Sequence, residues 1–150
     1  MSTVFEIALW VLLVVASATD LLWGKVFNVV TFPFLVVGVL SRGYFEGLTA
    51  LNGAVFSAAV AFAVFFPLYA LKVFAAGDVK LLMAIGAWTQ VSFVLQLGAF
   101  SILVGAIVGI FILFRQKGLK RGGTRMPFAP AIFCGCLLLK IFEMKGWKPW

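Results

Sequence analysis

Long stretches of the chain carry no charged side chain, and only short polar segments separate them. The uncharged runs are residues 7–19, 26–41, 47–71, 81–114 and 126–139. A helix needs about 17–25 predominantly apolar residues to cross a bilayer. The runs also lack the alternation of polar and apolar positions that indicates strands of a membrane barrel. The pattern therefore predicts a bundle of membrane-spanning α-helices.

The polar interruptions divide the chain into about six spans. We expect spans at about 4–19, 26–40, 51–71 and 127–142, with two more inside the run 81–114. That run is too long for one helix and long enough for two, and the polar residues in 88–92 mark the break between them. An even number of spans places both chain termini on the same side of the membrane.

Composition leads to the same fold class. Of the 150 residues, 64% are hydrophobic and 11% are charged, whereas soluble domains have roughly 45–50% apolar and about 25% charged residues. Because the spans fill nearly the whole chain, residues 1–150 are expected to form a single transmembrane domain. The prediction is an all-α polytopic membrane protein, a bundle of about six transmembrane helices, whose chemistry lies within the bilayer or at its edge.

Basic residues favour one side of this bundle. Eight of the 12 Lys and Arg fall in or beside the connections 20–25, 72–80 and 115–125, and the other four map to the opposite side. Because cytoplasmic loops carry the excess of Lys and Arg, these connections are expected to face the cytoplasm from the inner (cytoplasmic) membrane. The basic segment 115–125 is interpreted as a topology determinant that also contacts anionic lipid. Nothing in the pattern supports nucleic-acid binding, and the oligomeric state stays open.

Missing residue types restrict the possible chemistry. The sequence contains no His, which excludes a Ser-His-Asp triad and His-ligated metal sites. Cys134 and Cys136 stand two positions apart in the last predicted span, so their side chains point to different sides of a helix. We interpret them as small apolar residues rather than as a disulfide or a metal pair. No metal or cofactor is expected.

Two aspartates are the candidate catalytic residues. Asp20 ends the first predicted span and Asp78 begins the fourth, so two complete spans separate them and both return to the cytoplasmic face. Carboxylates close to hydrocarbon are costly and usually functional. A pair of them can divide the roles of general base and general acid in amide hydrolysis. The remaining acids, Glu6, Glu46 and Glu143, map to the opposite face.

Each aspartate also has a structural interpretation. Asp78 suits the N-cap of a helix that begins at Val79, and Asp20 suits the end of a span where Lys25 compensates its charge. Lys80 is interpreted as a flank that extends toward the membrane surface. If the pair is catalytic, helix poles suggest that Asp78, at a positive helix start, is the base. Asp20, at the negative end of the first span, would then hold the proton.

Three segments, in order and at matching spacing, resemble one family. Residues 77–86 read Gly-Asp-Val-Lys-Leu-Leu-Met-Ala-Ile-Gly, Asp20 is followed by Val26-Phe27-Asn28 and Thr31, and residues 125–131 read Arg-Met-Pro-Phe-Ala-Pro-Ala before Gly135. In type IV prepilin peptidases, the first of these segments is similar to the motif of the second aspartate. The second is similar to the segment of the first aspartate, and the third to the segment that opens the last core helix. These peptidases are membrane aspartic proteases of the Gly-x-Gly-Asp kind. Here Ala75 replaces the first Gly of that motif, and Phe27 replaces a Pro.

The resemblance implies an activity and a partner. It implies that Asp20 and Asp78 are catalytic and that the protein removes a short basic leader from prepilin or pseudopilin precursors at the cytoplasmic face. Large members of the family carry a cytoplasmic insertion with four Cys that is associated with N-methylation, and this chain has none. It resembles the short form found in tight-adherence (Flp) pilus systems or in archaeal preflagellin peptidases, so methyltransferase activity is not expected.

A non-catalytic role is the alternative from another class. A small transporter or a pilus-assembly subunit could use two acidic residues to bind a proton or a cation, as intramembrane carboxylates often do. The predicted spans show no inverted repeat, and the two acids lie at one face rather than near the bilayer midplane, where a translocation path needs them. The sequence therefore favours the peptidase.

Overall fold

A computed structural model describes residues 3–115 and 128–146 of the chain. Within these ranges the fold consists of helices and no strand, as expected for an all-α protein. The helices are α1 (Thr3–Trp23), α2 (Asn28–Glu46), α3 (Leu48–Ala70), α4 (Ala76–Trp88), α5 (Val91–Arg115) and α6 (Ala129–Met144). Beyond Arg115, the basic segment that we interpret as a topology determinant lies outside the described residues, and so does the start of the third motif.

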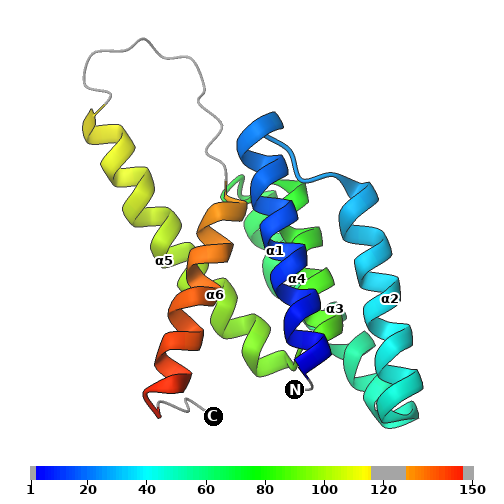
Figure 1. The fold of residues 1–150 in the computed structure, drawn as a ribbon. Helices are drawn as coiled ribbons and strands as arrows, with labels where there is room; N and C mark the ends of the chain where they lie inside the picture. Colours follow the sequence, from blue (N-terminus) through cyan, green and yellow to red (C-terminus); the bar gives the residue numbers. More distant parts are fainter. Residues whose placement is uncertain (1–2, 116–127, 147–150) are drawn as a thin grey trace.

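The helices form one bundle with two distinct ends (Figure 1). The end of α1, its connection to α2 and the beginning of α6 lie toward one end, and the beginning of α1 and the end of α6 lie at the other. This arrangement of the described helices agrees with the prediction that both chain termini lie on the same side. We call the end that holds the α1–α2 connection the aspartate end, because Asp20 and Asp78 both line a cavity there.

Two helix boundaries differ from the prediction. α1 continues past Asp20 to Trp23, so Asp20 lies in its last turn rather than at its end. α2 continues to Glu46, where an ion pair between Arg42 Nε and Glu46 Oε2 at 3.2 Å supports the last turn, and only Gly47 separates α2 from α3. Gly47 makes this tight connection with φ +89°, a conformation that favours glycine. The predicted break at 88–92 is confirmed.

The six helices are not equally long. Among the described residues, α1, α2, α3 and α5 are long and apolar enough to cross a membrane. α4 and α6 have 13 and 16 residues, so at 1.5 Å per residue they reach only about 20 and 24 Å, less than the roughly 30 Å of hydrocarbon in a bilayer. The polytopic helical bundle is confirmed, but two of the expected spans are short.

α4 lies at the centre of the bundle, packed mainly against α2 and α3. Nine of its 13 residues are buried. Gly86 lets α3 come close, because a Cβ at this position would lie 3.0 Å from the carbonyl oxygen of Ser57. At the far end of α4, the indole Nε1 of Trp88 donates a hydrogen bond to the carbonyl oxygen of Phe34 at 2.8 Å. These contacts fix α4, and with it the position of Asp78 in its first turn.

The outer surface and the far end fit a membrane environment. Large apolar side chains such as Phe56 and Phe111 are 63% and 64% exposed, as expected where lipid replaces water. At the end opposite the aspartates, Lys140 Nζ lies 2.8 Å from Glu6 Oε1 and 3.2 Å from Glu143 Oε2. These two acids therefore belong to the opposite face, as the sequence predicts, and the Glu6–Lys140 pair joins α1 to α6 there.

Candidate active site

Asp78 lies in the first turn of α4 and is 3% exposed. Its Oδ2 accepts a hydrogen bond from the backbone N–H of Ala75 at 2.9 Å. Ala75, not Asp78, occupies the N-cap position of α4. The interpretation of Asp78 as the N-cap is therefore wrong, because its carboxylate reaches back over the start of the helix from the third helical position.

Asp20 connects the end of α1 to the beginning of α6. Its Oδ2 accepts a hydrogen bond from the backbone N–H of Ala129 at 2.9 Å, and the residue is 7% exposed. One turn earlier on α1, Ser17 Oγ donates to the carbonyl oxygen of the same Ala129 at 3.3 Å. α1 thus holds both main-chain polar groups of the first residue of α6. The sequence analysis missed Ser17, whose only signal is its place three residues before Asp20.

The two carboxylates have similar helix-pole environments. Asp78 lies at the start of α4, and Asp20, although it belongs to the last turn of α1, binds a free N–H at the start of α6. Helix starts carry the positive end of the macrodipole and favour a carboxylate. The predicted difference between the aspartates, which considered α1 alone, therefore has no basis in the structure.

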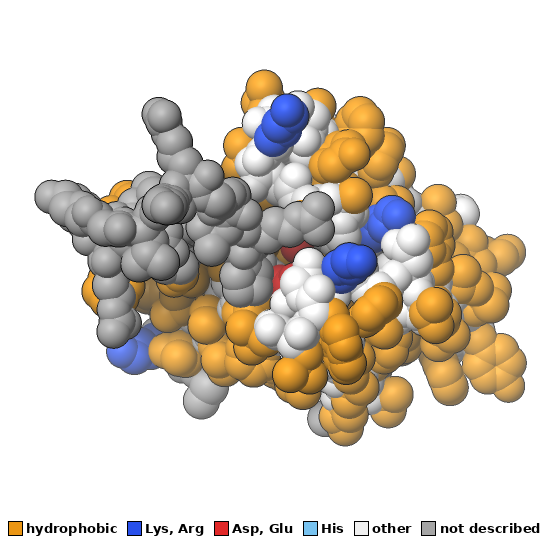
Figure 2. Space-filling model, turned by 90° about the horizontal axis from the view of Figure 1, so that it is seen from above, with side chains coloured by type: hydrophobic (Ala, Val, Ile, Leu, Met, Phe, Trp, Pro, Cys, Tyr) orange, Lys and Arg blue, Asp and Glu red, His pale blue; other side chains and the backbone are white. Residues whose placement is uncertain are grey.

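Both aspartates line one cavity of about 840 Å³ at the aspartate end. Seen from above, acidic side chains lie recessed between basic and apolar ones on this face (Figure 2). Lys25, Lys72 and Lys80 also line the cavity. Among the described residues, neither aspartate forms an ion pair, so compensation of Asp20 by Lys25 is not observed. The expectation that both aspartates share a face is confirmed.

Lys80 crosses from α4 to the beginning of α2. Its Nζ donates to Asn28 Oδ1 at 3.0 Å and lies 5.5 Å from the ring centroid of Phe32. Lys80 also lines the cavity, a location that the interpretation as a flank extending toward the membrane surface did not include. Lys72 lines the cavity as well, with a left-handed backbone at φ +60°. Such a conformation costs a non-glycine residue roughly 1–2 kcal/mol.

The two departures from the family pattern leave the backbone in ordinary conformations. Ala75 has φ −81° and ψ 157°, an extended conformation that any residue adopts, so this position does not require glycine. Phe27 has φ −76° and ψ 135°, within the range of proline. The glycine that is retained, Gly77, lies against the α1–α2 connection, where an added Cβ would be 3.1 Å from Val26 Cβ. Gly77 therefore still allows the α1–α2 connection to approach α4 closely beside Asp78.

The chemistry available in this cavity is that of two carboxyl groups. Within the described ranges, no group of three or more His, Cys, Asp or Glu side chains is close enough together to hold a metal ion. The two cysteines are free, with Cys134 exposed and Cys136 buried, in agreement with the prediction that they point to different sides. Two buried carboxyl groups that line one cavity can activate a water molecule and protonate a leaving group.

Comparison with known families points the same way. A family model described as the type IV leader peptidase family matches residues 7–110. The match includes most of α1, all of α2, α3 and α4, most of α5 and both aspartates, but not α6. No curated protein and no solved structure matches the chain.

Proposed function

Because the chain belongs to the type IV leader peptidase family, we propose that it is an aspartic endopeptidase that removes the short basic leader from pilin-like precursors. The observation that carries this proposal is the shared cavity, in which the buried carboxyl groups of Asp20 and Asp78 come together from α1 and α4. The family indicates a peptidase in general. The cavity supports the aspartic type, because these are its two acidic residues among those described.

The proposed reaction is the direct hydrolysis of one peptide bond. Like charges in one buried cavity favour a state in which the pair holds a single proton. The ionised carboxylate accepts a proton from water, and the resulting hydroxyl adds to the carbonyl carbon of the scissile bond. The protonated carboxyl then donates its proton to the amide nitrogen as the C–N bond breaks. The helix poles give no reason to assign base and acid to particular aspartates, because both carboxylates bind a main-chain N–H at a helix start.

The location of the cavity suits a substrate that lies partly in the membrane. The two short helices, α4 and α6, both begin at the aspartate end, and the first turn of α6 lies deeper than the ends of α1 and α5 (Figure 1). The aspartates are therefore recessed from the end of the bundle. From the excess of Lys and Arg, this end faces the cytoplasm from the inner membrane, so a basic leader stays outside the bilayer while the following apolar segment enters it.

The resemblance to the short form of the family supports leader removal without methylation. The sequence has only two Cys, and both lie in α6 rather than in a cytoplasmic insertion. We therefore propose a prepilin or pseudopilin precursor as the protein partner, membrane lipid as the surroundings, and no methyl transfer. The transporter alternative gains no support, because both acids lie at one end of the bundle.

A cleavage assay tests the proposal. The full chain, purified in detergent and reconstituted in lipid nanodiscs, is incubated with a synthetic precursor that joins a Lys-rich leader through a small residue to an apolar segment of about 20 residues. Mass spectrometry is expected to show one cut, between the leader and the apolar segment. An intact precursor, in the presence of folded protein, would refute the proposal.

A further inference from the structure

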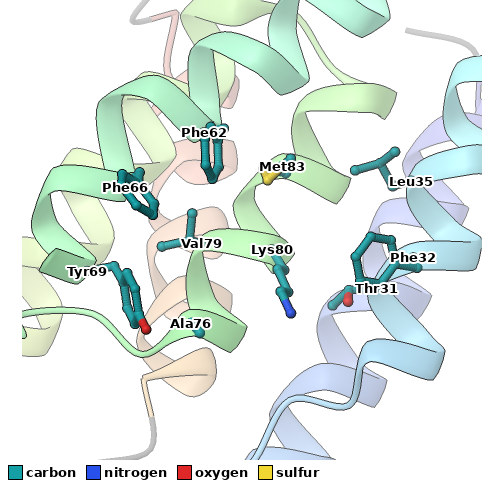
Figure 3. Close-up of a pocket in the computed structure, with 10 residues that line it drawn as sticks. All are labelled: Thr31, Phe32, Leu35, Phe62, Phe66, Tyr69, Ala76, Val79, Lys80 and Met83. Carbon is teal, nitrogen blue, oxygen red and sulfur yellow. The ribbon is translucent and has the colours of Figure 1, made fainter.

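A second hollow, which neither aspartate lines, opens between α2, α3 and α4. It has a volume of about 280 Å³, and its lining is almost entirely apolar. α3 contributes Phe62, Phe66 and Tyr69, α4 contributes Ala76, Val79, Lys80 and Met83, and α2 contributes Thr31, Phe32 and Leu35 (Figure 3). We call this hollow the apolar groove.

The apolar groove adjoins the aspartate cavity. Ala76 and Lys80 line both hollows. From Ala76 the groove follows α4 as far as Met83, seven residues or about 10 Å deeper into the bundle. On α3 the interval from Phe62 to Tyr69 has the same length, so the two walls match. A chain with its scissile bond at the aspartates can therefore continue into the groove without leaving the protein.

One side chain in the groove lacks the partner that a buried polar group needs. Thr31 is 2% exposed, and its Oγ1 has no hydrogen-bond partner in the part of the chain that the structure describes. Buried hydroxyl groups are normally hydrogen-bonded, so an exception needs an explanation. A lipid acyl chain offers nothing to this hydroxyl, whereas a polypeptide offers a main-chain N–H or C=O. The combination of apolar walls and one free hydroxyl therefore indicates an apolar peptide segment.

We propose that the apolar groove binds the apolar segment of the precursor directly after the bond that is cut, with a main-chain group hydrogen-bonded to Thr31 Oγ1. This inference rests on the proposed leader-peptidase function and adds the subsite that recognises the retained part of the substrate. Lys80 lines both hollows and marks where the segment passes from the aspartate cavity into the apolar groove.

Kinetics of groove variants give the first test, with the synthetic precursor described above. Thr31→Val keeps the side-chain shape and removes the hydroxyl, so KM is expected to rise about three- to tenfold with kcat unchanged. Thr31→Ser retains the hydroxyl and is expected to restore most of the affinity. Met83→Trp fills the groove and is expected to raise KM further, whereas Phe56→Trp, on the outer face of α3, serves as the matched control. An unchanged KM in both Thr31→Val and Met83→Trp would overturn the inference.

Photocrosslinking tests the inference independently of turnover. A photoreactive phenylalanine analogue replaces Phe66 in the groove or, as control, Phe56, in an Asp78→Asn background that leaves the precursor uncut. An adduct of the apolar segment with position 66 and none with position 56 supports binding of that segment in the groove. If this adduct forms but the wild type cleaves nothing, only the proposed function fails. Cleavage by the wild type without this adduct, or adducts with lipid alone, would overturn the inference and leave the function intact.

Discussion

Replacing Asp20 should affect stability and activity separately, because its carboxylate binds the start of α6. Asp20→Ala removes the acceptor that, among the described residues, binds the buried N–H of Ala129. Asp20→Asn keeps the size of the side chain and an oxygen that can accept the same hydrogen bond. We therefore expect both variants to lose peptidase activity and only the Ala variant to lose stability.

The size of the stability loss follows from the burial of the bond. Ala129 is 0% exposed with Asp20 in place, so in the Ala variant its N–H loses the carboxylate and regains a partner only where water enters the space that the side chain leaves. A buried polar group that loses its partner costs about 1–3 kcal/mol. At about 2–4 °C per kcal/mol for a chain of this size, Tm should fall by roughly 2–12 °C in Asp20→Ala. Thermal unfolding in detergent, followed by circular dichroism, measures this difference from Asp20→Asn.

Ser17→Ala is the matched control on the same turn of α1. It removes the 3.3 Å hydrogen bond to the carbonyl oxygen of Ala129, a neutral bond whose acceptor belongs to the helical ladder of α6. Its loss should cost no more than about 1 kcal/mol, and the peptidase should remain active. Equal Tm values for Asp20→Ala and Asp20→Asn would refute the conclusion that Asp20 stabilises the α1–α6 contact.

Two further predictions follow from other parts of the bundle. In Gly38→Ala, the new Cβ would lie 2.5 Å from Trp88 Nε1, so the protein should lose about 1–3 kcal/mol from overpacking. Gly53→Ala meets no atom within 4 Å and should be neutral or stabilising by up to about 1 kcal/mol, and thermal unfolding compares the two. Alkylation should label the exposed Cys134 and spare the buried Cys136, and neither alkylation nor EDTA should reduce cleavage. Inactivation by EDTA would show that a metal ion takes part.

The helices could be predicted because the membrane imposes a strong pattern on sequence. The uncharged runs predicted the number of helices, their order and the break near Trp88, because polar side chains cluster where the chain meets water. Helix ends were less predictable. α1 continues past Asp20 and α2 reaches Glu46, because a helix ends where its hydrogen bonding ends, and a charged residue does not by itself mark that position.

The candidate site could be predicted only in part. Counting spans was enough to predict that Asp20 and Asp78 lie at the same end of the bundle, because each span reverses the direction of the chain. The contact between Asp20 and Ala129 joins residues 109 positions apart, and no local pattern reveals it. The assignment of base and acid stays an untested prediction, and its argument from helix poles was incomplete, because the environment of Asp20 depends on α6 as well as on its own helix.

The most direct test of the two-aspartate mechanism compares precursor cleavage by Asp20→Asn, Asp78→Asn and the wild type in the same nanodiscs. Each substitution removes one carboxyl group and retains the side-chain volume, so each should lower kcat by about a hundred- to ten-thousandfold. Tm and expression should stay close to those of the wild type, which shows that the loss is chemical. Substantial turnover by either folded variant would contradict the mechanism.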